Sequence, residues 1–381
     1  MAALGENAPG LGIGMVGYAF MGRAHSHAWR SVGPFFDPPL RPEMTALAGR
    51  NAAKVQGAAR ELGWASTETD WKALLRRDDI GLIDICTPGD GHAEIAIAAL
   101  DAGKHVLCEK PLANSVAEAE AMVAAADRAR ERGVRSMVAF NYRRVPAIAL
   151  ARRLVAEGRL GTIRHVRAQY LQDWLADPGA PWTWRMDKER AGSGALGDIA
   201  AHIIDTTQFV TGQQITDVSA LLRTFVHERP HDGGTRPVTV DDAALFIGRT
   251  SGGATASFEA TRFATGRKNS LRIELNGSQG SLAFDLESLN ELWFHDAAED
   301  SLTGGFRRIL VTEAEHPYMA AWWPPGHIIG YEHTFTHEIA DLLTAIAGGT
   351  DPSPSFADGL QVQRVLAAVA ESAETGTWRT T

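Results

Sequence analysis

The stretch that decides the fold is residues 11–22, LGIGMVGYAFMG, near the start of the chain. The spacing G-x-G-x-x-G occurs in it from Gly12 to Gly17, and again from Gly17 to Gly22 with alanine in place of the middle glycine. A phosphate-binding glycine loop must follow a strand and open a helix. Nothing before Gly12 could form a strand, because the apolar run is residues 11–16 itself. The second phase is therefore the better one, and it predicts a nucleotide loop made by Gly17, Ala19, Phe20, Met21 and Gly22.

Residues 11–140 continue as an alternation of apolar strands and helical segments. The expected strands are 11–16, 44–48, 82–86, 105–108 and 136–140. The expected helices are 24–31, 52–62, 92–102 and 116–132. Such alternation is typical of a parallel sheet covered by helices on both faces. We therefore predict an α/β Rossmann domain that binds a dinucleotide over residues 1–143.

The pattern changes after about residue 160, where strand-like segments follow one another. They are 163–169, 218–227, 243–249, 254–259, 271–276, 281–285, 291–295 and 307–311, with helices at 198–210, 331–347 and 359–375. This order predicts an α+β domain over residues 144–381, with a large, mostly antiparallel open sheet that serves substrate binding and oligomerisation. Because unpaired sheet surface is usually covered, we expect a homo-oligomer, a dimer or tetramer.

Composition excludes several classes of protein. The chain has 381 residues, which favours two domains, and a net charge of −9 without a basic run to offset it. We therefore expect no nucleic-acid partner and no acidic membrane surface. The apolar runs are too short to span a membrane. Residues 1–10 lack the basic and apolar parts of a signal peptide, so the expected location is cytoplasmic.

Two segments nearly a hundred residues apart carry the chemistry. Residues 108–111, CEKP, close an apolar run and put Lys110 at the carboxyl end of a strand. In residues 197–205, GDIAAHIID, Asp198 and His202 are spaced i,i+4 and share one helix face. An amine, an imidazole and a carboxylate beside a nicotinamide would form an alcohol-oxidising site. The alternative for Asp198 is a simple helix N-cap.

The end of the second expected strand bears on the choice of dinucleotide. An acidic residue there would hold the ribose 2′-hydroxyl, but this strand is followed by Gly49 and Arg50. A missing carboxylate beside an arginine favours acceptance of NADP. Alternatively, Arg50 stacks on the adenine and NAD serves. Trp71 either flanks the adenine or packs a surface helix.

Patterns that resemble metal sites fall short. His333 and His337 are spaced i,i+4, but no third ligand with metal spacing accompanies them. The segment 337–341 begins like a zinc-protease helix, but its second histidine is an aspartate. The pair His25 and His27 is likewise incomplete. We expect no metal.

Taken together, these motifs resemble a known family. Residues 17–22, Thr87-Pro88, residues 109–111 and residues 192–202 are similar to the signature of the Gfo/Idh/MocA oxidoreductases, and the resemblance covers essentially the whole chain. Within that family, residues 22–29 and 330–335 look most like glycoside dehydrogenases. The resemblance implies an NAD(P)-dependent enzyme that oxidises a ring secondary alcohol of a pyranoside, anhydrosugar or cyclic polyol to a ketone. The chain departs from the family pattern at Ala19, Gly49 and Gly89.

The resemblance also implies the roles of the site residues. Lys110, Asp198 and His202 would be the catalytic set. With an ordinary pKa near ~6.5, His202 suits the role of acid and base, while Lys110 stabilises the developing alkoxide. Asp198 would orient the imidazole or bind a neighbouring hydroxyl. Further cofactor contacts are expected from Thr87, Pro88, His92, Glu109 and Lys110.

Aromatic and charged residues in loops of the second half suit a ring that carries several hydroxyls. The expected substrate-binding residues are Lys110, Arg143, Trp174, Arg185, Asp198, His202, His327 and His333. One alternative is a sugar-processing enzyme that holds its NAD(P) tightly and recycles it internally. Another is a non-catalytic sugar-sensing regulator of the same fold, against which Lys110 and His202 argue.

Overall fold

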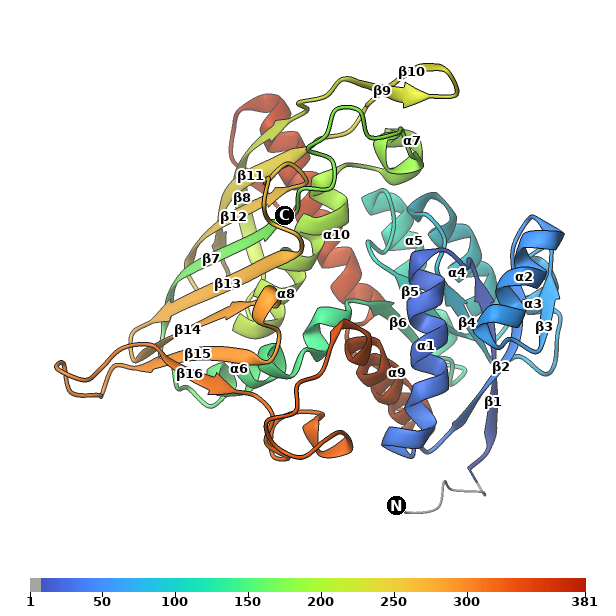
Figure 1. Ribbon diagram of the computed structural model, residues 1–381, viewed down its shortest axis with the longest axis horizontal. Coiled ribbons are helices and arrows are strands. Elements are labelled where there is room, and N and C mark those ends of the chain that lie inside the picture. Colours follow the sequence, from blue (N-terminus) through green and yellow to red (C-terminus); the bar gives the residue numbers. More distant parts are fainter. Residues whose placement is uncertain (1–7) are drawn as a thin grey trace. The chain divides into compact units, whose positions relative to one another are not determined.

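The computed structural model describes residues 8–381, and the chain divides into two compact units (Figure 1). Unit 1 extends to Asn141 and includes Gly330–Leu360, while unit 2 comprises Tyr142–Ile329 and Gln361–Thr381. The expectation of no signal peptide falls mostly on residues 1–7, which lie outside the described range. No helix within residues 8–381 is long and apolar enough to cross a membrane.

Unit 1 contains a six-stranded sheet in the order β3-β2-β1-β4-β5-β6. All of its strand pairs are parallel. This is the strand order of dinucleotide-binding folds, so the predicted Rossmann domain is confirmed. The strands are β1 (Gly10–Val16), β2 (Arg41–Ala48), β3 (Ser66–Glu68), β4 (Leu82–Ile85), β5 (His105–Glu109) and β6 (Ser136–Ala139). The sequence did not predict β3, because three polar residues carry no apolar pattern.

The helices of unit 1 are α1 (Phe20–Phe36), α2 (Ala52–Leu62), α3 (Lys72–Leu75), α4 (His92–Asp101), α5 (Val116–Arg130) and α9 (Tyr331–Gly348). They include the four predicted for the first domain, one of them with a shifted start, together with α3, which was not predicted, and α9, which was predicted for the second domain. The start of α1 lies at Phe20, four residues before the expected 24, so the glycine loop joins strand to helix without a spacer. At α5 the Ser115 hydroxyl accepts the Glu118 N–H, which caps the start of this helix.

The predicted assignment of residues 330–360 to the second domain is wrong in the structure. Helix α9 packs along α1, and its Phe335, Ile339 and Leu342 lie in one buried cluster with Trp29 of α1. Burial of this apolar face stabilises the returning segment inside unit 1. Periodicity in the sequence marks the apolar face of a helix, but not the element that will cover it.

Unit 2 is built on a nine-stranded sheet in the order β16-β15-β14-β13-β7-β12-β11-β8-β17. Only the pair β7 and β12 is parallel, so the predicted mostly antiparallel sheet is confirmed. The strands are β7 (Ile163–Leu171), β8 (Ile215–Arg223), β11 (Ala243–Thr250), β12 (Thr255–Thr261), β13 (Ser270–Gly277), β14 (Gly280–Asp285), β15 (Glu291–Asp296), β16 (Arg307–Leu310) and β17 (Arg379–Thr380). A separate hairpin is formed by β9 (Glu228–His231) and β10 (Gly234–Pro237).

Helices cover one face of this sheet. They are α6 (Pro146–Ala156), α8 (Ala201–Thr211) and the unit 2 part of α10 (Phe356–Thr375), and a short α7 (Lys188–Ala191) lies in a loop (Figure 1). On the opposite face, alternate strand residues are exposed, among them Leu221, Leu245, Ile247 and Trp293. The sheet of unit 2 therefore has one packed face and one open face.

Candidate active site

The glycine loop of unit 1 has the geometry of a nucleotide loop. Gly12 and Gly14 lie inside β1, so the rejection of the first glycine phase is confirmed. Gly17 has a φ of 102°, and a Cβ there would lie 2.6 Å from the Cys86 carbonyl oxygen. Helix α1 begins at Phe20 without a side-chain cap. Uncapped N–H groups at a helix start after a close glycine turn fit the pyrophosphate of a dinucleotide.

Other predicted cofactor residues follow the carboxyl ends of neighbouring strands. Gly49 and Arg50 come after β2, Thr87-Pro88 after β4, and Lys110 after β5. Carboxyl ends of parallel strands meet at one edge, and ligands of doubly wound sheets bind there, beside the point where strand order reverses. Here that point lies between β1 and β4. The structure thus brings these residues to one edge of unit 1.

Around this edge, three side chains have clear surroundings. Arg50 is exposed, whereas the ring of Tyr18 lies against Gly49 where a Cβ would otherwise stand. Trp71 is half-buried at the start of α3, and the Lys72 ammonium lies 5.3 Å from its ring centroid. Both predicted roles of Trp71, beside the adenine or on a surface helix, are compatible with these surroundings.

Two predicted cofactor residues, His92 and Glu109, form hydrogen bonds with the protein backbone. The His92 ring nitrogens lie 3.0 Å from the carbonyl oxygens of Thr87 and Pro111. Glu109 is 4% exposed, and its Oε2 accepts the Lys110 N–H at 3.0 Å. The hydrogen-bonding atoms of these side chains therefore support the turns around Lys110, and their contact with the cofactor stays a prediction.

In unit 2, the segment with Asp198 and His202 is not one regular α-helix. Leu196–Ala200 form a π-helical turn that runs into α8. Asp241 is buried and accepts the N–H groups of Gly194 at 2.7 Å and Leu196 at 2.8 Å, which fixes the start of this turn. Burial raises the pKa of the Asp241 carboxyl. Asp198 lies inside the turn and is no N-cap, so the capping alternative is wrong.

Aromatic and polar side chains surround His202. It is 6% exposed, and its ring centroid lies 4.7 Å from that of Tyr142 and 5.8 Å from that of Tyr170. The two tyrosine hydroxyls are 2.8 Å apart, and that of Tyr170 donates to Asn269 Oδ1 at 2.7 Å. This chain of hydroxyls and amide beside an imidazole suits a polyhydroxylated ligand.

Asp198 has a partner that the sequence did not predict. Arg262 Nη2 lies 3.0 Å from Asp198 Oδ2, and the Arg262 side chain is only 1% exposed. The guanidinium carbon also lies 5.4 Å from the ring centroid of Trp174. Arg262 follows the last residue of β12, so only the fold brings it to Asp198.

The remaining predicted substrate residues each have partners within the protein. Arg143 is buried and pairs with Asp205 at 2.6 Å, which accounts for its position without a ligand. Arg185 stacks on Trp184 at 4.5 Å, and Trp174 is 43% exposed with its Nε1 donating to Gln172. His327 is exposed, 2.8 Å from the Pro324 carbonyl oxygen. His333 belongs to unit 1, where its Nδ1 accepts the Gly330 N–H at the start of α9.

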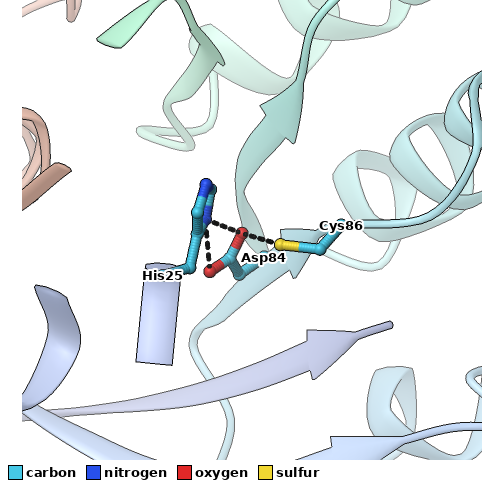
Figure 2. Close-up of side chains that lie close together, drawn as sticks. All are labelled: His25, Asp84 and Cys86. Carbon is cyan, nitrogen blue, oxygen red and sulfur yellow. Dashed lines mark hydrogen bonds and ion pairs between the residues drawn. The ribbon is translucent and has the colours of Figure 1, made fainter. Parts of the chain in front are cut away.

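One group of possible metal ligands occurs within residues 8–381. Ligand atoms of His25, Asp84 and Cys86 lie within 4.8 Å of one another, all buried (Figure 2). His25 Nδ1 is already hydrogen-bonded to Asp84 at 2.9 Å. Burial, followed by the charge of Asp84, raises the pKa of the Cys86 thiol, whereas a metal-binding thiolate needs a lowered one. The group therefore fits a hydrogen-bonded cluster better than a metal site.

A Rossmann sheet with a glycine loop and a strand-end lysine, followed by a mixed-sheet domain, defines a nicotinamide-dependent oxidoreductase. The chain belongs to the Gfo/Idh/MocA family. Residues 11–140 match the oxidoreductase family with the NAD-binding Rossmann fold, and residues 148–283 match the Gfo/Idh/MocA C-terminal domain. Unit 1 is therefore an NAD-binding domain, and the predicted enzyme class is confirmed.

Several known proteins are similar over the whole chain. Levoglucosan dehydrogenase from Pseudarthrobacter phenanthrenivorans is 42% identical over 97% of both chains. A structure of levoglucosan dehydrogenase with NADH and levoglucosan has a TM-score of 0.94 at 43% identity, covering 97% of this chain and 99% of that one. An oxidoreductase domain protein from Kribbella flavida has a TM-score of 0.96 at 67% identity, covering 98% and 99%. The similarity to glycoside dehydrogenases expected from residues 22–29 and 330–335 is thus confirmed.

Proposed function

We propose that the enzyme oxidises a ring secondary alcohol of a pyranoside, anhydrosugar or cyclic polyol to a ketone, with transfer of hydride to NAD(P). The observation that carries this proposal is the whole-length similarity to levoglucosan dehydrogenase, whose name states an anhydrosugar substrate. It is supported by the hydroxyl and amide side chains around His202 in unit 2. These groups can donate and accept at once, as several neighbouring hydroxyls require.

The proposed chemistry divides the work between the units. When bound, the nicotinamide accepts the hydride that leaves the carbinol carbon. His202 removes the hydroxyl proton as that hydride leaves, since imidazole is the side chain best suited to accept and return a proton near neutral pH. The Lys110 ammonium donates a hydrogen bond to the same oxygen and stabilises the developing alkoxide. Asp198, fixed by Arg262, orients the imidazole or binds a neighbouring hydroxyl.

For the dinucleotide, we propose NAD as the main cofactor, with acceptance of NADP through Arg50. NAD is supported by relatives whose structures contain NADH. Acceptance of NADP is supported by the exposed guanidinium of Arg50 and by the lack of an acidic residue in the turn after β2. A ribose 2′-phosphate would approach that turn, where a carboxylate would repel it.

We also propose that a second copy of the chain covers the open face of the unit 2 sheet. Leu221 and Leu245 are cross-strand neighbours on this face, and both are at least 43% exposed. Around them lie opposite charges in pairs, Arg167 with Glu274 and Arg272 with Asp285. An apolar patch with interspersed charges of both signs is self-complementary, as a two-fold interface requires.

The test is turnover by the purified protein with NAD and a panel of levoglucosan, pyranosides and inositols, followed at the nicotinamide absorbance band. We expect oxidation of at least one ring alcohol. Absence of turnover on the whole panel would contradict the proposal. Release of a nucleotide on denaturation of such an inactive preparation would then point to the alternative enzyme that recycles a tightly held cofactor.

A further inference from the structure

A buried polar network lies directly behind the Lys110 turn in unit 1. His25 of α1 is 1% exposed, and its Nδ1 lies 2.9 Å and 3.0 Å from the two carboxylate oxygens of Asp84 (Figure 2). Its Nε2 lies 3.0 Å from Glu109 Oε1. Asp84 sits on β4 and Glu109 ends β5, so one imidazole joins three elements of the domain.

The charges in this network explain why a histidine is needed. The Asp84 and Glu109 side chains are 0% and 5% exposed, and two carboxylates so deeply buried require a cation or several donors. Burial opposes the charged imidazole, but the charge of Asp84 outweighs it, so the pKa of His25 is raised well above its ordinary value. As an imidazolium, His25 donates one N–H to each carboxylate.

The network ends on the backbone of the catalytic turn. Glu109 Oε1 accepts a hydrogen bond from His25 Nε2, and Glu109 Oε2 accepts one from the Lys110 N–H at 3.0 Å. At the other end, Trp29 Nε1 donates to Asp84 Oδ2 at 2.7 Å. Helix α1, which carries His25 and Trp29, begins at Phe20, within the glycine loop of residues 17–22. The glycine loop and the Lys110 turn are therefore linked through helix α1 and the imidazole of His25.

We propose that His25 is a positioning residue for Lys110: by bridging Asp84 and Glu109, it holds the Glu109 carboxylate in the rotamer that fixes the Lys110 backbone. This proposal rests on the role proposed above for Lys110. His25 itself touches neither substrate nor nicotinamide. Because small displacements of a reacting group reduce rates sharply, loss of this bridge lowers kcat more than it lowers affinity for the dinucleotide.

Two substitutions separate the two hydrogen bonds of the ring. The amide nitrogen of glutamine reaches the position of Nε2, so H25Q retains a donor to Glu109. The amide nitrogen of asparagine matches Nδ1, so H25N retains only the donor to Asp84. We expect H25N to lower kcat by about 10- to 100-fold with an unchanged Kd for NADH, and H25Q to stay near the native kcat.

The matched control is Trp64→Phe. Trp64 lies in the buried apolar cluster that contains Trp29, and its Nε1 donates to the hydroxyl of Ser26, the neighbour of His25. It has no hydrogen bond to His25, Asp84 or Glu109. We expect this control to lower thermal stability without change in kcat. Equal losses of kcat in H25N and H25Q, in proportion to their losses of stability, would overturn the proposal.

A double-mutant cycle with Lys110→Ala completes the test. If His25 acts through Lys110, H25N causes no further loss of kcat once the lysine is gone. If H25N lowers kcat by the same factor in the native protein and in the Lys110→Ala variant, the positioning role is overturned, even where Lys110→Ala alone is strongly impaired. A loss below about tenfold in Lys110→Ala alone overturns the proposed function of the lysine, and with it the proposal for His25.

Discussion

The two units support their candidate catalytic groups by different means. In unit 1, Lys110 stands on a turn whose backbone is held on both sides, by Glu109 at its own N–H and by His92 at the Pro111 carbonyl. In unit 2, Asp198 is held through its side chain by Arg262, and His202 rests against two tyrosine rings. Changes to the support should therefore alter backbone position in unit 1 and side-chain charge and orientation in unit 2.

The strongest way to break this comparison is to remove the reacting groups themselves. We expect Lys110→Ala and His202→Ala each to lower kcat by about 10²–10⁴-fold, because positioned acid–base groups contribute that much. Steady-state kinetics with the best substrate of the panel will measure it. Losses of kcat below about tenfold in both variants would reject the catalytic roles of Lys110 and His202.

The next largest effect is expected from loss of the ion pair between Arg262 and Asp198. Arg262→Met removes the buried guanidinium and leaves the carboxylate without its 3.0 Å partner. We expect kcat to fall by about tenfold or more, since each unit of 1.4 kcal/mol corresponds to a factor of ten. Arg262→Lys keeps the positive charge and should recover part of that loss. If both variants lose only stability, measured by thermal unfolding, Arg262 is structural alone.

The open face of unit 2 offers a test of assembly. Leu245→Asp places a charge in the exposed apolar patch, and burial of an unpaired charge at an interface should dissociate the oligomer. Light scattering after size-exclusion chromatography measures the mass. Leu302→Asp is the matched control, because Leu302 is 92% exposed in the turn between β15 and β16. An unchanged mass for Leu245→Asp would place the interface elsewhere.

A smaller effect is expected for the choice of dinucleotide at unit 1. If Arg50 meets the 2′-phosphate, Arg50→Ala should lower kcat/KM with NADP by about tenfold, the cost of one exposed charge-assisted contact. The same variant should leave kcat/KM with NAD nearly unchanged. A parallel loss with both cofactors would instead indicate that Arg50 stacks on the adenine.

The smallest effect concerns acid stability of unit 1. Burial, and then the charge of Arg135, lowers the pKa of His105 to about 4, and His105 Nδ1 accepts the Arg135 N–H. Because the folded state favours the neutral ring, this contribution is complete above the ordinary pKa of about 6.5 and is lost as pH falls toward 4.

Urea unfolding between these pH values should show a loss of about 1–2 kcal/mol that is absent in His105→Gln, after discount for the partial exposure of the ring. His105→Gln is the control for the native protein, because glutamine does not titrate and the variant shows the pH dependence of all other groups. Equal pH dependence of the two proteins would contradict the assignment.

The sequence predicted the elements of unit 1 well, because glycines and buried strands restrict the local backbone. The correct glycine phase followed from the strand that must precede the loop, and Gly17 does adopt a positive φ. The start of α1 was placed four residues late, since the loop itself carries no cap. Helix α6 was not predicted, and neither was the π-helical turn at Asp198, because propensity does not distinguish i→i+5 bonding from a regular helix.

Local sequence alone determined that a turn at Gly17 joins a strand to a helix, and that Lys110 directly follows a buried strand. Steric limits on φ and ψ and the burial of apolar strands act over a few neighbouring residues. Only the tertiary structure decided the partners: His25 for Glu109, Arg262 for Asp198, Tyr142 and Tyr170 for His202, and α1 for the returning helix α9. Such contacts depend on which elements pack together, and buried polar groups accept whatever partner the packing brings within hydrogen-bond distance.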